Sequence, residues 1–252
     1  MKLLDVGGGM GVNVMSLKKF GGFETYLIDR FTEYEPQYKN IMGTHNEGLS
    51  LMEALGVQVK RRDFVSDGLN YVDESFDIVT CIEVIEHIPG SCRNLLHEIL
   101  RVLRPGGFIL LGCPNIANLR YRISLLFGKS PHVDIRFWHK SNPYFGYYRE
   151  YTPSEVRYML QDAGFRNIKI ETNEKRLLSL VKDRIIQRKT EEGRKGTLIT
   201  KIGKRQVPFY LAGVLYYLIA NNIPGLGYSI SCLLYTSPSP RDLSTSRMPS
   251  SA

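Results

Sequence analysis

The sequence predicts a three-layer α/β/α fold around a doubly wound, mostly parallel β-sheet. Three observations predict it. Short apolar runs alternate with helical patterns over residues 1–115, which is the pattern of a parallel sheet with helices on both faces. The run from Phe76 to Val84 is almost entirely apolar, as a strand buried on both faces should be. A glycine-rich turn joins the first apolar run to the first helical pattern.

The first eleven residues predict a strand, a tight turn and the start of a helix that continues to Phe20. The apolar run at residues 3–6 contains one acid, Asp5. Three glycines follow at alternate positions: Gly7, Gly9 and Gly11. Such a turn lets the backbone approach a nucleotide closely. The dinucleotide fingerprint G-x-G-x-x-G needs a glycine where Val12 stands, so a nicotinamide dinucleotide is disfavoured.

The remaining elements are expected in alternation along the chain. Strands are expected at 24–29, 57–63, 76–84, 108–112 and 167–171, and helices at 92–103, 116–127 and 153–163. The last helix has Thr152 as N-cap, Pro153 at its first position and Gly164 as its stop. Asp29 ends the second strand about 20 residues past the glycines, where an acid can bind both ribose hydroxyls.

The glycine spacing, with Asp5 two residues before it, resembles motif I of the class I S-adenosylmethionine-dependent methyltransferases. The resemblance covers roughly residues 2–171 and implies a Rossmann-like fold with S-adenosylmethionine as cofactor. It implies that Asp63 meets the adenine amino group and that Phe64 packs on the adenine ring. It also places Glu83 at the edge of the cofactor site. In the family, residues 116–150 form a lid over the substrate.

The stretch Glu83-Val84-Ile85-Glu86-His87 follows the fourth strand, at the sheet edge where ligands bind in open α/β folds. It resembles the corresponding motif of the ubiquinone-pathway O-methyltransferases. We assign His87 as the candidate general base for a hydroxyl acceptor. His132 and His139, in the lid region, are alternative bases. We assign no metal ligand, although two acids and a histidine at this spacing hold magnesium in some relatives.

These observations predict an enzyme that transfers a methyl group to a small molecule, at an oxygen atom, with a lipid- or sugar-linked acceptor as the favoured class. One alternative is an RNA methyltransferase with a metal at the E-x-x-E-H motif. Another is a non-catalytic binding module on the same fold. The acceptor itself and the oligomeric state cannot be inferred from the sequence.

Residues 172–231 differ from the neutral region before them. Residues 172–206 carry eleven basic and four acidic residues, a net charge of +7, and the apolar stretch 207–220 follows. Basic residues beside a tyrosine-rich apolar helix suit a peripheral contact with a membrane surface through 172–230. The alternative is a helix that covers the sheet or lid. No recognisable nucleic-acid-binding module accompanies the basic segment, which disfavours a nucleic-acid partner.

Residues 232–252 look like the in-frame translation of a sequencing-library adapter, and we exclude them from the fold prediction. The last, antiparallel strand is then expected at 226–230 and incomplete. Because the glycine turn lies so close to residue 1, we also expect the chain to be a fragment. The remaining cysteines, Cys81, Cys92 and Cys113, show no C-x-x-C pair, which favours a cytoplasmic protein.

Overall fold

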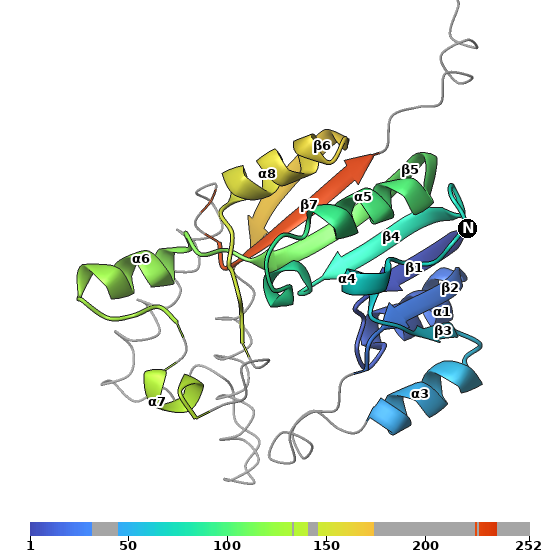
Figure 1. Cartoon of the computed structure of the whole chain (residues 1–252), viewed down its shortest axis with the longest axis horizontal. Coiled ribbons are helices and arrows are strands. Elements are labelled where there is room, and N and C mark those ends of the chain that lie inside the picture. The colour runs from blue at the N-terminus through green and yellow to red at the C-terminus, as the bar shows by residue number, and fades with distance from the viewer. Residues whose placement is uncertain (32–44, 133, 141–145, 174–224, 226, 236–252) are drawn as a thin grey trace, which may run out of the picture.

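The computed structural model describes residues 1–31, 45–132, 134–140, 146–173, 225 and 227–235, which form a seven-stranded sheet with helices on its faces (Figure 1). The strands are β1 Lys2–Val6, β2 Glu24–Asp29, β3 Gln58–Arg61, β4 Phe76–Ile82, β5 Leu103–Pro114, β6 Arg166–Asn173 and β7 Ser229–Tyr235. The helices are α1 Val12–Gly21, α3 His45–Ala54, α4 Phe64–Asp67, η1 Ile85–His87, α5 Arg93–Val102, α6 Leu119–Leu126, α7 Ile135–Trp138 and α8 Pro153–Asp162.

The strand order is β3-β2-β1-β4-β5-β7-β6. The first five strands are parallel, and β7 runs antiparallel between β5 and β6. The order reverses at β1, because β2 lies on one side of it and β4 on the other. Ligands of open α/β sheets bind beyond the carboxyl ends of the strands at such a reversal. The mostly parallel seven-stranded sheet and its strand order confirm the predicted fold class.

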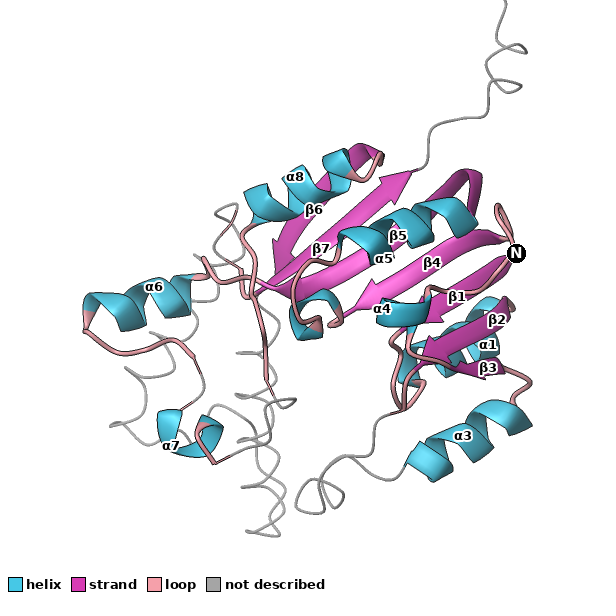
Figure 2. Cartoon of the chain, in the orientation of Figure 1, coloured by secondary structure: helices cyan, strands magenta, loops and turns pink. Residues whose placement is uncertain are grey.

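Side chains alternate between two hydrophobic cores, one on each face of the sheet. In β1, Leu3 belongs to the core beneath α1 and α3, whereas Leu4 belongs to the core beneath α5 and α8. Leu27 and Ile28 of β2 divide in the same way. Figure 2 shows the helices on both sides of the magenta sheet. This alternation fixes the register of β1 and β2, and with it the place where each strand ends.

Side-chain caps begin α6 and α8. The Thr152 hydroxyl accepts the N–H of Glu155, whose carboxylate accepts the N–H of Thr152 in return at 2.8 Å, a capping box with Pro153 in the first turn. At α6 the Asn118 side chain accepts the N–H of Tyr121 at 2.9 Å. Because this cap lies at Asn118, α6 begins three residues later than the predicted start of the helix at Ile116.

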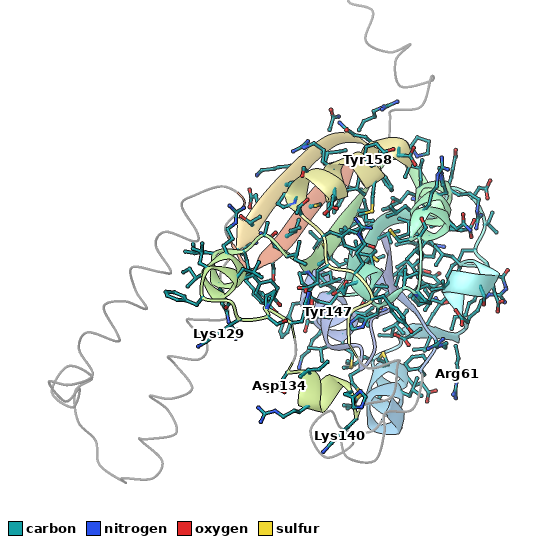
Figure 3. The ribbon with its side chains drawn as sticks, turned by 60° about the vertical axis from the view of Figure 1, so that its left-hand side comes forward. Arg61, Lys129, Asp134, Lys140, Tyr147 and Tyr158 are labelled. Carbon is teal, nitrogen blue, oxygen red and sulfur yellow. The ribbon has the colours of Figure 1, made fainter. Side chains whose placement is uncertain are left out.

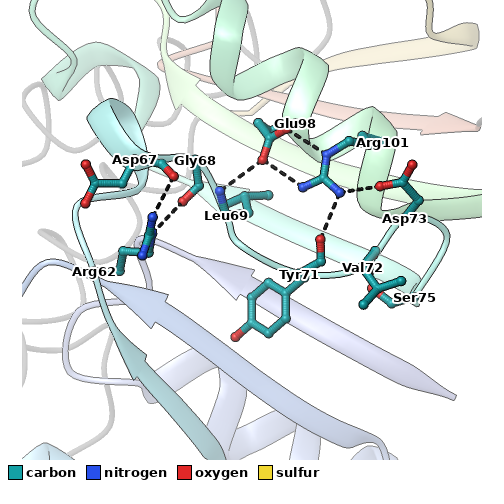
Figure 4. Close-up of polar contacts among 10 residues, drawn as sticks. All are labelled: Arg62, Asp67, Gly68, Leu69, Tyr71, Val72, Asp73, Ser75, Glu98 and Arg101. Carbon is teal, nitrogen blue, oxygen red and sulfur yellow. Dashed lines mark hydrogen bonds and ion pairs between the residues drawn. The ribbon is translucent and has the colours of Figure 1, made fainter.

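A polar network holds the loop between α4 and β4 against α5 (Figure 4). The Arg101 guanidinium pairs with Glu98 and Asp73 and donates to the carbonyl of Tyr71 at 2.8 Å. Glu98 also accepts the N–H of Leu69 at 3.1 Å. Hydrogen bonds to the backbone of Leu69 and Tyr71 therefore hold the loop between α4 and β4 against α5. Because this loop leads into β4, the same contacts help to position that strand.

The last strand differs from the sequence prediction. Residues 229–235 form β7, which pairs with β5 from Pro114↔Ser229 to Phe108↔Tyr235. The expectation of an incomplete strand at 226–230 was wrong, and so was the exclusion of 232–235 from the fold. The physical reason is local: Ile230 and Cys232 alternate into the core with no exposed surface, and the adapter-like run Cys-Leu-Leu-Tyr is as apolar as a central strand requires.

The basic segment and the apolar stretch, residues 174–224, lie outside the described residues, as do 236–252. The predicted division into 1–171, 172–231 and 232–252 is therefore not tested beyond the strand described above. Within the described ranges, no helix combines the length and apolarity needed to cross a membrane. All four cysteines are buried and unpaired, with Cys232 now among them.

Candidate cofactor and acceptor site

The glycine turn between β1 and α1 is held in a conformation that favours glycine. Gly7, Gly9 and Gly11 all have positive φ, at 70°, 53° and 73°. A Cβ at Gly7 would lie 2.6 Å from the Val84 side chain, and one at Gly11 would lie 2.2 Å from the sulfur of Met52. Among the residues that the structure describes, none would lie within 4 Å of a Cβ at Gly9. Within that part of the chain the tip of the turn is open, while its two ends are packed.

Asp29, at the carboxyl end of β2, braces the tip of this turn. Its Oδ2 accepts the N–H of Gly9 at 2.9 Å, and its Oδ1 accepts the N–H of Phe31 at 2.7 Å. The carboxylate thus lies beside the exposed tip of the turn and keeps lone pairs for further donors. This is the place at which an acid can receive the hydroxyls of a ribose.

Asp5 is the buried acid of β1. It is paired in register with Thr80 of β4, whose hydroxyl donates to Asp5 Oδ1 at 2.6 Å. Burial raises the pKa of Asp5 to about 6, against the opposing effect of this hydrogen bond. A Cβ at Gly8 would lie 2.4 Å from Asp5 Oδ2. The buried carboxyl of Asp5 leaves no room for a side chain at position 8, so a glycine is required there. The sequence prediction did not single out Gly8.

Asp63 and Phe64 lie at the start of α4. Asp63 caps the helix by accepting the N–H groups of Val65 and Ser66 at 3.1 and 3.4 Å, and pairs with Arg30 at 3.3 Å. These contacts lower the pKa of Asp63 against a desolvation effect in the other direction. Phe64 is buried in the larger core, and its ring tip lies 3.5 Å from the Cβ position of Gly7. Phe64 therefore lies beside the glycine turn, and Asp63 pairs with the residue that follows Asp29.

Strand β4 ends at Ile82, two residues earlier than predicted, because the backbone turns sharply at Glu83. Glu83 has φ 57°, a left-handed conformation that is uncommon outside glycine, and its N–H donates to the carbonyl of Gly112 at 2.8 Å. The next residue, Val84, packs against the glycine turn. The backbone strain and this contact place the E-x-x-E-H stretch directly beside the predicted cofactor turn.

His87 lies at the end of η1, with its ring against Gly146 and Tyr147. Its Nδ1 is 3.0 Å from the carbonyl oxygen of Gly146, and its ring meets Tyr147 edge-on at a centroid distance of 5.1 Å. A carbonyl only accepts, so Nδ1 carries the proton and Nε2 of the neutral ring is left as an acceptor. Partial burial lowers the pKa of His87, while the charge of Glu83 acts in the opposite direction.

Glu86, the second acid of the E-x-x-E-H stretch, lies near Glu150, a neighbour that the sequence prediction did not identify. Glu86 has no exposed surface, and neither of its carboxylate oxygens has a hydrogen-bond partner in the described part of the chain. Burial and the nearby charges of Glu83 and Glu150 raise its pKa. Glu150 is also buried, and the hydroxyl of Tyr121 and the ring of His132 approach it. No sequence pattern indicated that Glu86 and Glu150 lie close together, because they are 64 positions apart in the sequence.

The alternative bases and ligands are placed less favourably. His132 Nδ1 lies 3.4 Å from Glu150 Oε2, so this ring faces the buried carboxyl of Glu150. His139 follows α7 and donates its backbone N–H to the carbonyl of Ile135. Across the residues that the structure describes, no three His, Cys, Asp or Glu side chains converge as metal ligands would. Glu83 is exposed and Glu86 is buried, although the charge of Glu83 reaches the Glu86 carboxyl.

These residues fit an S-adenosylmethionine site on geometric grounds. The open tip at Gly9 leaves room for a ligand against the backbone. Asp29 lies beside that tip, and Asp63 and Phe64 lie at the end of the neighbouring strand. Fold and site together define the class I S-adenosylmethionine-dependent methyltransferases. Within that class, the family model Methyltransf_23, a methyltransferase domain, matches residues 1–170. The chain belongs to this family.

Several curated proteins resemble the chain over part of its length. A sterol 24-C-methyltransferase from Gibberella zeae is 34% identical over 114 residues, which cover 42% of this chain and 26% of that protein. A ubiquinone biosynthesis O-methyltransferase from Colwellia psychrerythraea is 28% identical over 129 residues, or 50% of this chain and 47% of that protein. The chain thus spans about half or less of these relatives.

Solved structures share the fold at low sequence identity. A SAM-dependent methyltransferase from Archaeoglobus fulgidus superposes with a TM-score of 0.55 at 15% identity, covering 93% of this chain and 86% of that one. Phosphoethanolamine N-methyltransferase 2 from Haemonchus contortus, in complex with S-adenosyl-L-methionine, gives 0.57 at 17% identity and covers 95% of this chain and 49% of that one. The sheet described above is therefore the fold of these enzymes.

Proposed function

We propose that this protein transfers a methyl group from S-adenosylmethionine to a hydroxyl of a small molecule, with His87 as the general base. The observation that carries the proposal is the contact between His87 Nδ1 and the Gly146 carbonyl at 3.0 Å. It fixes the tautomer in which Nε2 accepts a proton. A base is needed when the acceptor is a hydroxyl, because the oxygen must lose its proton during the reaction.

The cofactor would be held by the residues around the glycine turn. Asp29 would receive the ribose hydroxyls, and the backbone at Gly9 would lie against the ligand. Asp63 and Phe64, at the start of α4, would hold the adenine. S-adenosylmethionine supplies an electrophilic methyl group bound to its sulfonium. The protein's own contribution is to align the acceptor and exclude water.

The negative charge of Glu83 supports His87 as the proposed base. This charge acts on His87 and favours the imidazolium that forms once the ring has taken a proton. Burial has the larger, opposite effect and lowers the pKa of His87. The ring is therefore neutral near pH 7 and able to accept a proton, which is the state that a general base needs before the reaction.

The favoured acceptor is a lipid- or sugar-linked small molecule. The names of the two relatives, a ubiquinone biosynthesis O-methyltransferase and a sterol 24-C-methyltransferase, support a lipid-related acceptor. The peripheral membrane contact through 172–230 and the cytoplasmic location stay predictions, since residues 174–224 lie outside the described part of the chain.

The full chain, titrated with S-adenosylmethionine in a calorimeter, tests the cofactor proposal. Saturable one-site binding supports it, and absence of heat at millimolar ligand overturns it. Release of S-adenosylhomocysteine is then followed with a catechol, a primary alcohol and a short RNA as acceptors. Turnover on RNA that a chelator abolishes would favour the metal-dependent RNA alternative. Binding without turnover on any acceptor, together with unchanged behaviour of a His87→Ala variant, would favour the non-catalytic module.

A further inference from the structure

The outer side of α6 and the turn after it carry an exposed apolar surface. This α6 surface consists of Ile123, Leu125, Leu126 and Phe127, which are 40%, 60%, 84% and 76% exposed. Single exposed apolar residues are ordinary on protein surfaces, but four within five positions on one projecting helix end are not. The first turn of the same helix is anchored, because Tyr121 is buried. The surface is therefore presented outward by a fixed helix.

Basic side chains frame the α6 surface. Arg120 and Arg122 lie before the apolar run and Lys129 lies after it, and residues 116–133 contain no aspartate or glutamate. All three basic residues are exposed. Figure 3 shows Lys129 at the outer end of α6. An apolar patch with a one-sided positive rim is complementary to a surface that combines hydrocarbon with negative charge.

We propose that the α6 surface docks on a lipid bilayer that contains anionic headgroups. The apolar side chains Leu125, Leu126 and Phe127 would enter the boundary between headgroups and acyl chains, while the basic residues pair with lipid phosphates. Helix α6 has eight residues and rises only about 12 Å, so it lies at the surface and does not span the bilayer. The inference does not depend on the acceptor proposed above.

The root of α6 links this surface to the candidate site. Asn118, which caps α6, donates to the carbonyl of Asn115 at 2.6 Å, and Asn115 follows directly after β5. Tyr121 approaches the buried Glu150 beside the lid. Figure 1 shows α6 projecting from the sheet on the side where β5 ends. Docking through α6 would therefore bring the carboxyl edge of the sheet, and the site upon it, next to the membrane.

Vesicle flotation of the full chain tests the proposal without cofactor or acceptor, so its failure leaves the proposed methyl transfer untouched. The probes are phosphatidylcholine vesicles with and without phosphatidylglycerol. We expect stronger binding to the anionic vesicles and weakening at high salt. The double variant Leu126→Asp/Phe127→Asp should bind at least about tenfold more weakly. Phe20→Asp is the matched control, because Phe20 is equally exposed, at 82%, and follows Lys18 and Lys19 on α1.

Four outcomes would overturn the proposal. The first is no binding of the wild-type chain to anionic vesicles. The second is equal loss in the α6 variant and in Phe20→Asp. The third is wild-type binding by the α6 variant, which would assign the contact to another segment such as 172–230. The fourth is an altered sedimentation coefficient or melting temperature of the α6 variant in the absence of vesicles, which would show that a second copy or the chain itself covers α6.

Discussion

Asp29 and Gly9 are joined by a hydrogen bond of 2.9 Å, in which the carboxylate at the end of β2 accepts the N–H at the tip of the glycine turn. One residue therefore does two things. It fixes the backbone of the turn in its left-handed conformation, and it places a negative charge next to the open space that the turn faces. Shape and charge of the cofactor site are set by the same contact.

Replacing Asp29 by alanine should weaken S-adenosylmethionine about 10- to 100-fold, because a charged hydrogen-bond acceptor contributes about 1.5–3 kcal/mol. Calorimetric titration gives the dissociation constant. Asp67→Asn is the control, since this exposed acid is the last residue of α4 and its carboxylate accepts from the Ser66 hydroxyl. An unchanged dissociation constant in Asp29→Ala would mean that the cofactor binds elsewhere.

Alanine at Gly9 should act mainly on cofactor binding, and alanine at Gly8 mainly on stability. At Gly9 the new Cβ meets no atom of the described residues within 4 Å, so folding loses only about 1–2 kcal/mol for the left-handed backbone, while cofactor affinity falls because the methyl group occupies the open tip. At Gly8 the Cβ would clash with Asp5 at 2.4 Å, so the melting temperature should fall most. Thermal melts and titrations of both variants check this. Equal melting temperatures would contradict it.

Stability should fall as the pH rises through the range in which Asp5 ionises. Its pKa in the folded protein is about 6, against 3.8 for the unperturbed group, so the folded state holds the proton more tightly and loses up to about 3 kcal/mol between pH 4 and pH 7. Asp5→Asn removes this loss, and should be more stable than wild type at pH 7 but not at pH 4.

Urea unfolding at the two pH values measures the Asp5 effect. Thr80→Val is the informative comparison, because it removes the hydroxyl that lowers the pKa of Asp5. Its stability should drop more steeply with pH than that of the wild type. If Asp5→Asn is destabilising by the same amount at both pH values, the buried carboxyl is not the source of the pH dependence.

His87→Ala should lower kcat by about 100- to 10,000-fold, the usual contribution of a general base, with a small change in KM. In the wild type, kcat should decline as the pH falls through the pKa of His87, which burial holds below its ordinary 6.5. That acid limb should disappear in the variant. His132→Ala, at the alternative histidine, should keep it. If the acid limb of the kcat–pH profile disappears in His132→Ala instead, His132 is the general base.

A chain that ends at Ser231 should be less stable than one that ends at Tyr235. It loses the pairing of residues 232–235 with β5 and the fully buried Cys232 side chain, together about 2 kcal/mol or more, or a melting temperature lower by about 4–8 °C. Differential scanning calorimetry of the two chains decides it. Identical transitions would show that β7 contributes only through residues 229–231.

The parts of the molecule that the sequence predicted well depend on local patterns. The β1–turn–α1 unit and Asp29 follow from glycine spacing and from acids at strand ends, and β2 was predicted to its exact bounds. The requirement for Gly8 was missed because it comes from the packing of the Asp5 side chain. The meeting of Glu86 with Glu150 was missed because the two residues are far apart in the sequence and only the folded chain brings them together. The prediction failed at β7, because residues 232–235 were excluded as adapter-like sequence but form part of a strand between β5 and β6.

The position of β7 between β5 and β6 also determines the order in which the sheet can be completed. Strand β6 has no partner but β7 among the described strands, and its last residue, Asn173, precedes Ser229 by 56 positions. During synthesis, β6 must therefore wait for the chain beyond residue 229 before it can join the sheet. Closing so long a loop is slow, and until then β5 exposes an unpaired edge open to association with other chains.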